Sequence, residues 1–305
     1  MVFEIILRYF IKVTKNRKID FFVFACMISA SIWVPWINKN IYIGNVCPNT
    51  WHNPTILMVR PFAYYAVIKC MNIMGTPFSW EEIVRKKKEI CVLSIAIFFS
   101  VLAKPCFVQF FFPAIFFFCV GLVIYSKGKY LPNAVLLLIS CLPSLFLLLS
   151  QIYVLFLGEN TRLGGGMKIQ FMEAMKISNS HPILCQIISC AFPLSMLVYI
   201  IYTRKHTSKF YKFSWIMFLC AFLECALLIE DNARKTQGNF AWGLVLASSI
   251  IFTSNIGEYI KMLVDDSVYS KGKKCFFTVS TCLFITHVIV GIVWIYRIIV
   301  LRSYL

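Results

Sequence analysis

The chain has 305 residues, of which 60% are hydrophobic and only 14% are charged. A soluble domain of this length carries roughly 25% charged residues, so the composition excludes an ordinary soluble enzyme or binding module. Apolar runs of about 20 residues recur along the chain, and runs of that length cross a membrane as helices. We therefore expect an all-α, polytopic integral membrane protein.

The net charge of +17 is also typical of nucleic-acid-binding proteins, but the placement of the charges argues against that function. The cations lie in short segments beside apolar runs, where anionic lipid and the positive-inside rule favour them. We therefore expect membrane lipids, and no nucleic acid, as partners.

Residues 1–18 are expected to form an amphipathic, basic segment at the cytoplasmic surface, because Glu4, Arg8 and Lys12 fall four apart on one helical face. Residues 19–305 are expected to form a single helical transmembrane domain. Its nine candidate spans cover residues 19–37, 55–74, 90–103, 106–125, 134–157, 183–202, 214–229, 241–260 and 276–300. The third is short, and together with the fourth it is alternatively a helical hairpin entering from one side.

The positive-inside rule orients this arrangement. With the N-terminus in the cytoplasm, nineteen of the 30 Lys and Arg residues fall in inner segments and eight in outer ones. The outer loops are longer and chemically more varied than the inner ones. Within one of them, Met167 to Ser178 (MKIQFMEAMKIS) is predicted to form an interfacial helix.

The most polar stretch between two spans is Glu230 to Gly243, with the sequence EDNARKTQGNFAWG, and the predicted topology places it as a loop at the outer edge. The starts and ends of other spans bring more polar residues to the same edge. Cations there favour an anionic head group such as a phosphate. The candidate binding residues are His52, Asn53, Arg60, Lys104, Arg234, Asn239 and Trp242.

Several of the polar residues also have a simpler interpretation. Arg60 and Lys104 are near span ends, where long cationic side chains snorkel to the interface. Glu230 and Arg234 have the spacing of a helix-surface ion pair, and Trp242 has the position of an interfacial belt residue. Glu224, inside a span, is either paired within the bundle or protonated.

Several motifs in fixed order resemble bacterial polytopic membrane proteins that are encoded with surface-polysaccharide genes. The pattern ExxxRxxxGNFxW runs from Glu230 to Trp242, and AKPCFVQFFFPA runs from Ala103 to Ala114. WHNPT at Trp51 to Thr55 and LGGGM at Leu163 to Met167 are similar as well. The resemblance implies a GT-C type glycosyltransferase or polymerase that uses polyprenyl-phosphate-linked sugars at the outer face of the bacterial plasma membrane.

The resemblance also implies roles for the polar residues. Arg60, Lys104 and Arg234 would bind the leaving phosphate. Glu230 or Asp231 would act as the catalytic base that takes the proton of the acceptor hydroxyl. Trp242 would stack on a sugar, and Asn239 would bind its hydroxyls.

One departure leaves other functions open. GT-C enzymes typically carry an acidic residue in the first outer loop, whereas Asn38 to Pro54 contains neither Asp nor Glu. The alternatives are a transporter or flippase of lipid-linked sugar, and a non-catalytic membrane component that works with other polysaccharide-assembly proteins. No metal-ligand cluster and no cofactor are predicted, although one carboxylate and a lipid phosphate together can hold Mg²⁺.

Overall fold

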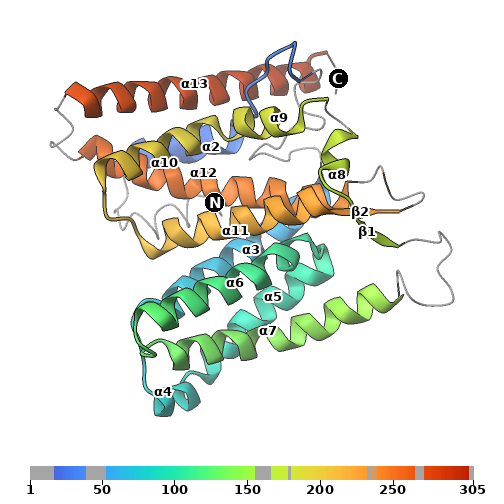
Figure 1. The fold of residues 1–305 in the computed structure, drawn as a ribbon, viewed down its shortest axis with the longest axis vertical. Helices are drawn as coiled ribbons and strands as arrows, with labels where there is room; N and C mark the ends of the chain where they lie inside the picture. Colours follow the sequence, from blue (N-terminus) through green and yellow to red (C-terminus); the bar gives the residue numbers. More distant parts are fainter. Residues whose placement is uncertain are drawn as a thin grey trace. The chain divides into compact units, whose positions relative to one another are not determined.

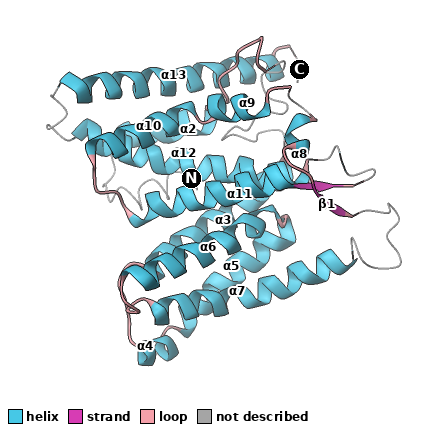
Figure 2. Ribbon diagram, viewed as in Figure 1, coloured by secondary structure: helices cyan, strands magenta, loops and turns pink. Residues whose placement is uncertain are grey.

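The computed structural model describes residues 17–38, 53–154, 166–177, 180–231, 235, 238–264 and 271–301. These residues are mainly helical, with one short two-stranded sheet (Figure 2). The chain forms two compact units. Unit 1 comprises residues 1–50, 172–215 and 244–305, and unit 2 comprises residues 51–171 and 216–243. Most of the predicted N-terminal segment, and the candidates His52 and Arg234, lie outside the described residues.

Six described helices are long and apolar enough to cross a membrane, which indicates a multi-pass membrane protein. A seventh span results if a bent helix pair is counted as one. The six candidates are Pro54–Ile73, Cys106–Tyr125, Leu131–Ile152, Lys209–Leu227, Asn239–Leu263 and Lys274–Ile299. Helices also occur in the other predicted runs, but α2 (Arg17–Ile28) has 12 residues and α5 (Lys87–Ala103) has 17.

Unit 2 is a bundle of antiparallel helices (Figure 1). Its elements are α3 (Pro54–Ile73), α4 (Trp80–Arg85), α5, α6 (Cys106–Tyr125), α7 (Leu131–Ile152), β1 (Met167–Ile169) and β2 (Leu228–Glu230). The second part of α11 (Lys209–Leu227) and the first turn of α12 (Asn239–Val264) also belong to this unit. Helix α5 packs against α3, α6 and α7. The turn between α6 and α7 and helix α4 lie at one end of this bundle, and the turn between α5 and α6 lies at the other.

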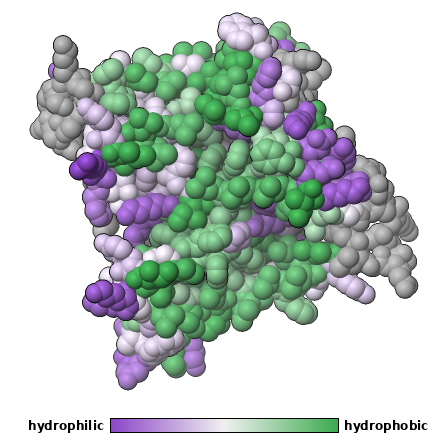
Figure 3. Space-filling view, in the orientation of Figure 1, coloured by the Kyte–Doolittle hydropathy of each residue, from purple (hydrophilic) through white to green (hydrophobic). Residues whose placement is uncertain are grey.

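The bundle surface is apolar over the helices and hydrophilic near α4 (Figure 3). Its interior is filled by aromatic side chains such as Phe107, Phe110 and Phe111, all with 0% exposure. At the α4 end, the buried Asn133 amide donates to the carbonyls of Ile73 and Thr76, at 2.5 and 2.8 Å. These bonds satisfy backbone groups that the end of α3 leaves open.

Unit 1 contains α2, α8 (Glu173–Lys176), α9 (Pro182–Ser189), α10 (Ala191–Thr203) and α13 (Lys271–Ile299), with parts of α11 and α12 (Asn239–Val264). Helices α9 and α10 meet at a bend of 69°. Near this bend, Ser31 and Ser189 are hydrogen bonded at 2.7 Å. His287 Nδ1 lies 2.6 Å from the Ala30 carbonyl oxygen, and its Nε2 accepts the Phe192 amide at 3.4 Å.

The prediction of a helix over Met167 to Ser178 is wrong for its first part. Met167–Ile169 is a β-strand that pairs antiparallel with Leu228–Glu230, with Met167 opposite Glu230. Only Glu173–Lys176 is helical. The reason is a long-range one, because pairing with the extended chain after α11 satisfies backbone groups that a local helical pattern would satisfy internally.

Candidate functional site

Glu230 is the buried carboxylate at the end of unit 2 that also holds the α5–α6 turn. It is the last residue of β2, and only 6% of it is exposed. The side-chain amide of Asn239, in the first turn of α12, donates to Glu230 Oε2 at 2.6 Å. The strand pairing fixes the backbone of Glu230, and the amide fixes its side chain. Both therefore hold this carboxylate in one orientation.

Lys104 supplies the cation of the site. It follows α5, where the next residue, Pro105, has no backbone N–H and starts a new helix. Its Nζ lies 4.8 Å from the ring centroid of Trp242, which is a cation–π distance. Burial lowers the pKa of Lys104 from its ordinary 10.5, while Cys106 and Glu230 oppose this shift. Lys104 is thus a partly desolvated cation within electrostatic range of Glu230.

A close helix crossing brings Trp242 to Lys104. A Cβ added to Gly243 would lie 3.1 Å from the Cys106 carbonyl oxygen, so the first turns of α12 and α6 touch there. The same point is 3.5 Å from Glu224 Oε2, which is buried and has no hydrogen-bond partner among the described residues. Glycine at this position therefore allows the approach that places Trp242 over the α5–α6 turn.

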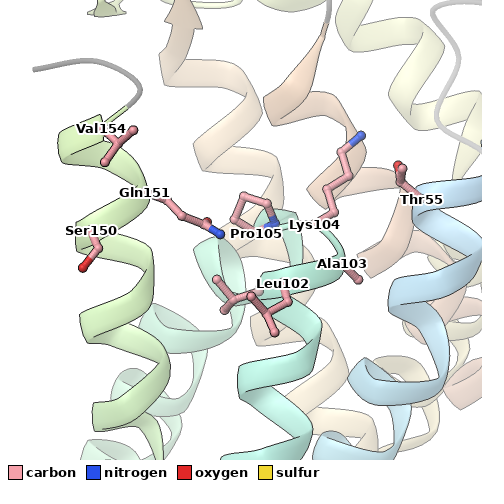
Figure 4. Close-up of a pocket in the computed structure, with 9 residues that line it drawn as sticks. Thr55, Leu102, Ala103, Lys104, Pro105, Ser150, Gln151 and Val154 are labelled. Carbon is pink, nitrogen blue, oxygen red and sulfur yellow. The ribbon is translucent and has the colours of Figure 1, made fainter. Parts of the chain in front are cut away.

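An open pocket of about 610 Å³ adjoins the turn. Its apolar lining comes mainly from the end of α5, through Val101, Leu102 and Ala103. The polar contributors are Thr55 from α3, Lys104, and Ser150 and Gln151 from the end of α7. Gln151 extends from α7 toward Pro105, whereas Ser150 points away from the turn (Figure 4). We did not predict Gln151 from the sequence, because its only distinguishing feature there is a side-chain amide near the end of an apolar run.

Asp231 differs from its neighbour Glu230. It forms an ion pair with Lys168, with Nζ and Oδ2 2.6 Å apart, and its side chain is 30% exposed. This pair links the chain after β2 to β1. Asp231 is therefore held in a partly solvated ion pair beside the two-stranded sheet of β1 and β2.

Two further predicted residues lie at the start of α3 and within it. The Asn53 side chain caps the helix, accepting from the Ile56 amide at 3.2 Å and from the Thr55 hydroxyl at 2.7 Å. Arg60 lies in the second turn of α3 and is buried, with 8% exposure. The structure thus brings together Glu230, Asn239, Lys104 and Trp242.

Within the described part of the chain, no group of three or more His, Cys, Asp or Glu residues has the arrangement of a metal site. The arrangement that is present consists of a buried carboxylate, an amide, an ammonium and an indole. These groups can accept a proton, orient a hydroxyl, bind an anion and contact an apolar ring face.

The chain matches no family model, no curated protein and no solved structure.

Proposed function

We propose that this protein is a glycosyltransferase or polymerase that uses polyprenyl-phosphate-linked sugars at the outer face of the bacterial plasma membrane. The observation that carries the proposal is the buried Glu230 carboxylate, which Asn239 orients and which lies within electrostatic range of Lys104. Transfer from a lipid phosphate needs both a base for the acceptor and a cation for the leaving group. The site supplies one of each.

The charges at the two ends of unit 2 support an outward-facing site. The end with α4 carries six cations, which are Arg85, Lys86, Lys87, Lys88, Lys127 and Lys129. The site end carries three among the described residues, which are Lys104, Lys168 and Lys235. The positive-inside rule then assigns the α4 end to the cytoplasm, which puts Glu230 on the outer side.

The proposed reaction is a direct displacement. The acceptor hydroxyl oxygen forms a bond to the anomeric carbon of the donor sugar while the bond from that carbon to the phosphate oxygen breaks. The electron pair leaves with the phosphate, whose charge Lys104 balances. The hydroxyl proton passes to Glu230, and Asn239 keeps the carboxylate in position. Trp242, whose ring centroid lies 4.8 Å from Lys104 Nζ, contacts the sugar in this proposal.

Among the two predicted bases, we favour Glu230 over Asp231. The Lys168 ammonium already neutralises Asp231 at 2.6 Å in a partly exposed pair. Glu230 is more deeply buried, so a proton taken from a hydroxyl there meets less competition from water. The two adjacent carboxylates therefore provide a matched test.

The test compares Glu230→Gln with Asp231→Asn in a strain that lacks the native gene. We expect Glu230→Gln to abolish surface glycan and to leave lipid-linked sugar accumulated at the outer face, because transfer is blocked after the donor has arrived. We expect Asp231→Asn to keep output within about twofold of the native protein, as for a partly exposed ion pair. Normal output from Glu230→Gln with a normal protein level would refute the proposal.

A second candidate function is transport of the lipid-linked sugar across the membrane. It is favoured by the 69° bend between α9 and α10 in unit 1, since interrupted helices line transport sites in many carriers. In that case, loss of the protein would leave lipid-linked sugar at the inner face. The side on which the intermediate accumulates therefore separates the two functions.

A further inference from the structure

We propose that the α4 end of unit 2 binds the phosphate head group of an anionic phospholipid, through two segments that are far apart in the chain. Its cations are Arg85, Lys87 and Lys88 at the junction of α4 and α5, and Lys127 and Lys129 in the α6–α7 turn. Both segments lie at the end of the bundle opposite the α5–α6 turn (Figure 1). The proposed site is therefore separate from Glu230 and independent of the proposed function.

The charges of these five cations are not balanced within the described part of the chain. None of the five forms an ion pair with a described residue. Nearby carboxylates have other partners, since Glu82 accepts from the Ser79 amide at 2.7 Å and Glu89 lies 3.7 Å from Lys86. An external anion can thus bind these cations without displacing an internal partner, and phosphate oxygens form charge-assisted hydrogen bonds with both lysine and arginine.

Hydrogen bonds join the two segments before any ligand binds. The Tyr130 hydroxyl, at the end of the α6–α7 turn, donates to the Gly75 carbonyl at 3.2 Å. The Asn133 amide donates to the Thr76 carbonyl at 2.8 Å, and its oxygen accepts from the Phe78 amide at 3.2 Å. The loop that these bonds fix leads directly into α4. Both sets of cations are therefore held at one place, which reduces the ordering that binding of one head group would cost.

Apolar side chains at the same end indicate a lipid rather than a soluble anion. Trp80 and Val84 fall four apart on α4, and Ile124 and Tyr125 end α6; all four are more than half exposed. Trp and Tyr are enriched at the level of the lipid head groups. A phospholipid would contact the cations with its phosphate and these side chains with its acyl chains. A soluble anion would leave the apolar groups in water.

The experiment uses the full chain in phosphatidylcholine nanodiscs that contain a trace of phosphatidylglycerol with a diazirine at the start of one acyl chain. Phosphatidylcholine with the same diazirine is the reference probe. After illumination, we expect the phosphatidylglycerol probe to label peptides from α4 and the α6–α7 turn at least about fivefold more strongly, since one cation near an anionic lipid already contributes about that factor. Equal labelling by the two probes would overturn the inference.

Two charge variants test whether the segments act together. One combines Lys127→Gln with Lys129→Gln, and the other combines Arg85→Gln, Lys87→Gln and Lys88→Gln. Each should lower labelling of both segments to the level of the reference probe, because one head group contacts both. Lys127→Arg with Lys129→Arg is the matched control, which keeps the charge and should label like the native protein. Loss of labelling confined to the altered segment would refute a joint site.

A third variant and soluble competitors distinguish a lipid from other anions. Trp80→Ser with Val84→Ser keeps every cation and should reduce labelling about threefold, because apolar contacts to the acyl chains are lost. Unlabelled phosphatidylglycerol should compete with the probe more strongly than inorganic phosphate or a short RNA. Normal labelling of the serine variant, or stronger competition by either soluble anion, would overturn the assignment to a phospholipid.

Discussion

Two buried carboxylates of this protein differ in how their charge is balanced. Glu258 in unit 1 is 3% exposed and has Lys261 Nζ at 2.8 Å, with the Ser208 hydroxyl donating at 3.4 Å. Glu230 in unit 2 is 6% exposed, and no described cation lies within ion-pair distance of it. Asn239 and the more distant Lys104 are its partners.

This difference separates a structural carboxylate from a candidate catalytic one. Glu258 is held in a close ion pair, so its charge is already balanced. Glu230 is held by a neutral amide, which fixes it in space without balancing its charge. We therefore expect changes at Glu258 to affect folding, and changes around Glu230 to affect transfer.

The largest effect is expected for Glu258→Ala. Loss of this buried side chain leaves a cavity in unit 1 and takes the partner from Lys261, which is itself 39% exposed. The free energy of unfolding should therefore fall by about 3 kcal/mol, mainly because of the cavity. Thermal unfolding of the purified protein in detergent measures this change. Glu230→Gln, which keeps the volume of its side chain, should unfold within about 1 kcal/mol of the native protein. Equal losses for both variants would remove the distinction between the two carboxylates.

The next largest effect is expected for Lys104→Met, which should slow transfer. Removing a charge-assisted contact to the leaving phosphate should cost about 2 kcal/mol of transition-state stabilisation, or roughly thirtyfold in kcat/KM. Lys104→Arg keeps the charge and should recover most of this loss. If Met and Arg at this position gave the same rate, the charge of Lys104 would have no role in transfer.

Gly243→Ala should have a smaller effect, because it changes the position of the site rather than its chemistry. The added methyl group would lie 3.1 Å from the Cys106 carbonyl oxygen and push α12 from α6. Overpacking of this kind costs about 1 to 2 kcal/mol. Gly121→Ala is the control, since nothing lies within 4 Å of its added Cβ. Transfer activity and thermal unfolding of both variants decide whether this crossing positions Trp242.

The smallest change is expected in the pH profile of transfer. Because burial lowers the pKa of Lys104, the side chain loses its charge as the pH rises through a value below the usual 10.5. Transfer should therefore decline on the alkaline side before an ordinary lysine would deprotonate. Arginine stays charged to about pH 12 and beyond, so Lys104→Arg should move this decline upward. An unchanged alkaline limb would show that Lys104 does not control it.

The sequence predicted an all-α, multi-pass fold, because long apolar runs have few alternatives in a membrane. Six described helices are long and apolar enough to cross it, or seven with the bent pair, so the nine predicted spans are not confirmed. The sequence also grouped Glu230, Lys104, Asn239 and Trp242 at one edge, together with Asn53 and Arg60, which lie at and within α3, and with His52 and Arg234, which lie outside the described residues. The same reasoning did not distinguish Glu230 from Asp231. That distinction depends on the ion pair with Lys168, which the pairing of β1 with β2 creates.

Two features had no local signal. The strand Met167–Ile169 forms because a distant segment is extended beside it, and the spacing of its apolar residues also suited a helix. Gln151 becomes part of a pocket only because α7 ends beside the α5–α6 turn. Both depend on contacts between segments that are far apart in the chain, which neither periodicity nor charge pattern contains.

The most direct test of the central claim is the single-turnover release of polyprenyl phosphate by the purified protein in proteoliposomes, with lipid-linked sugar and acceptor supplied. If Glu230 is the base, Glu230→Gln should slow release by roughly 100-fold or more, as expected for loss of a general base. The donor should still bind, and Asp231→Asn should release at nearly the native rate. Equal release rates for the native protein and Glu230→Gln would contradict the claim.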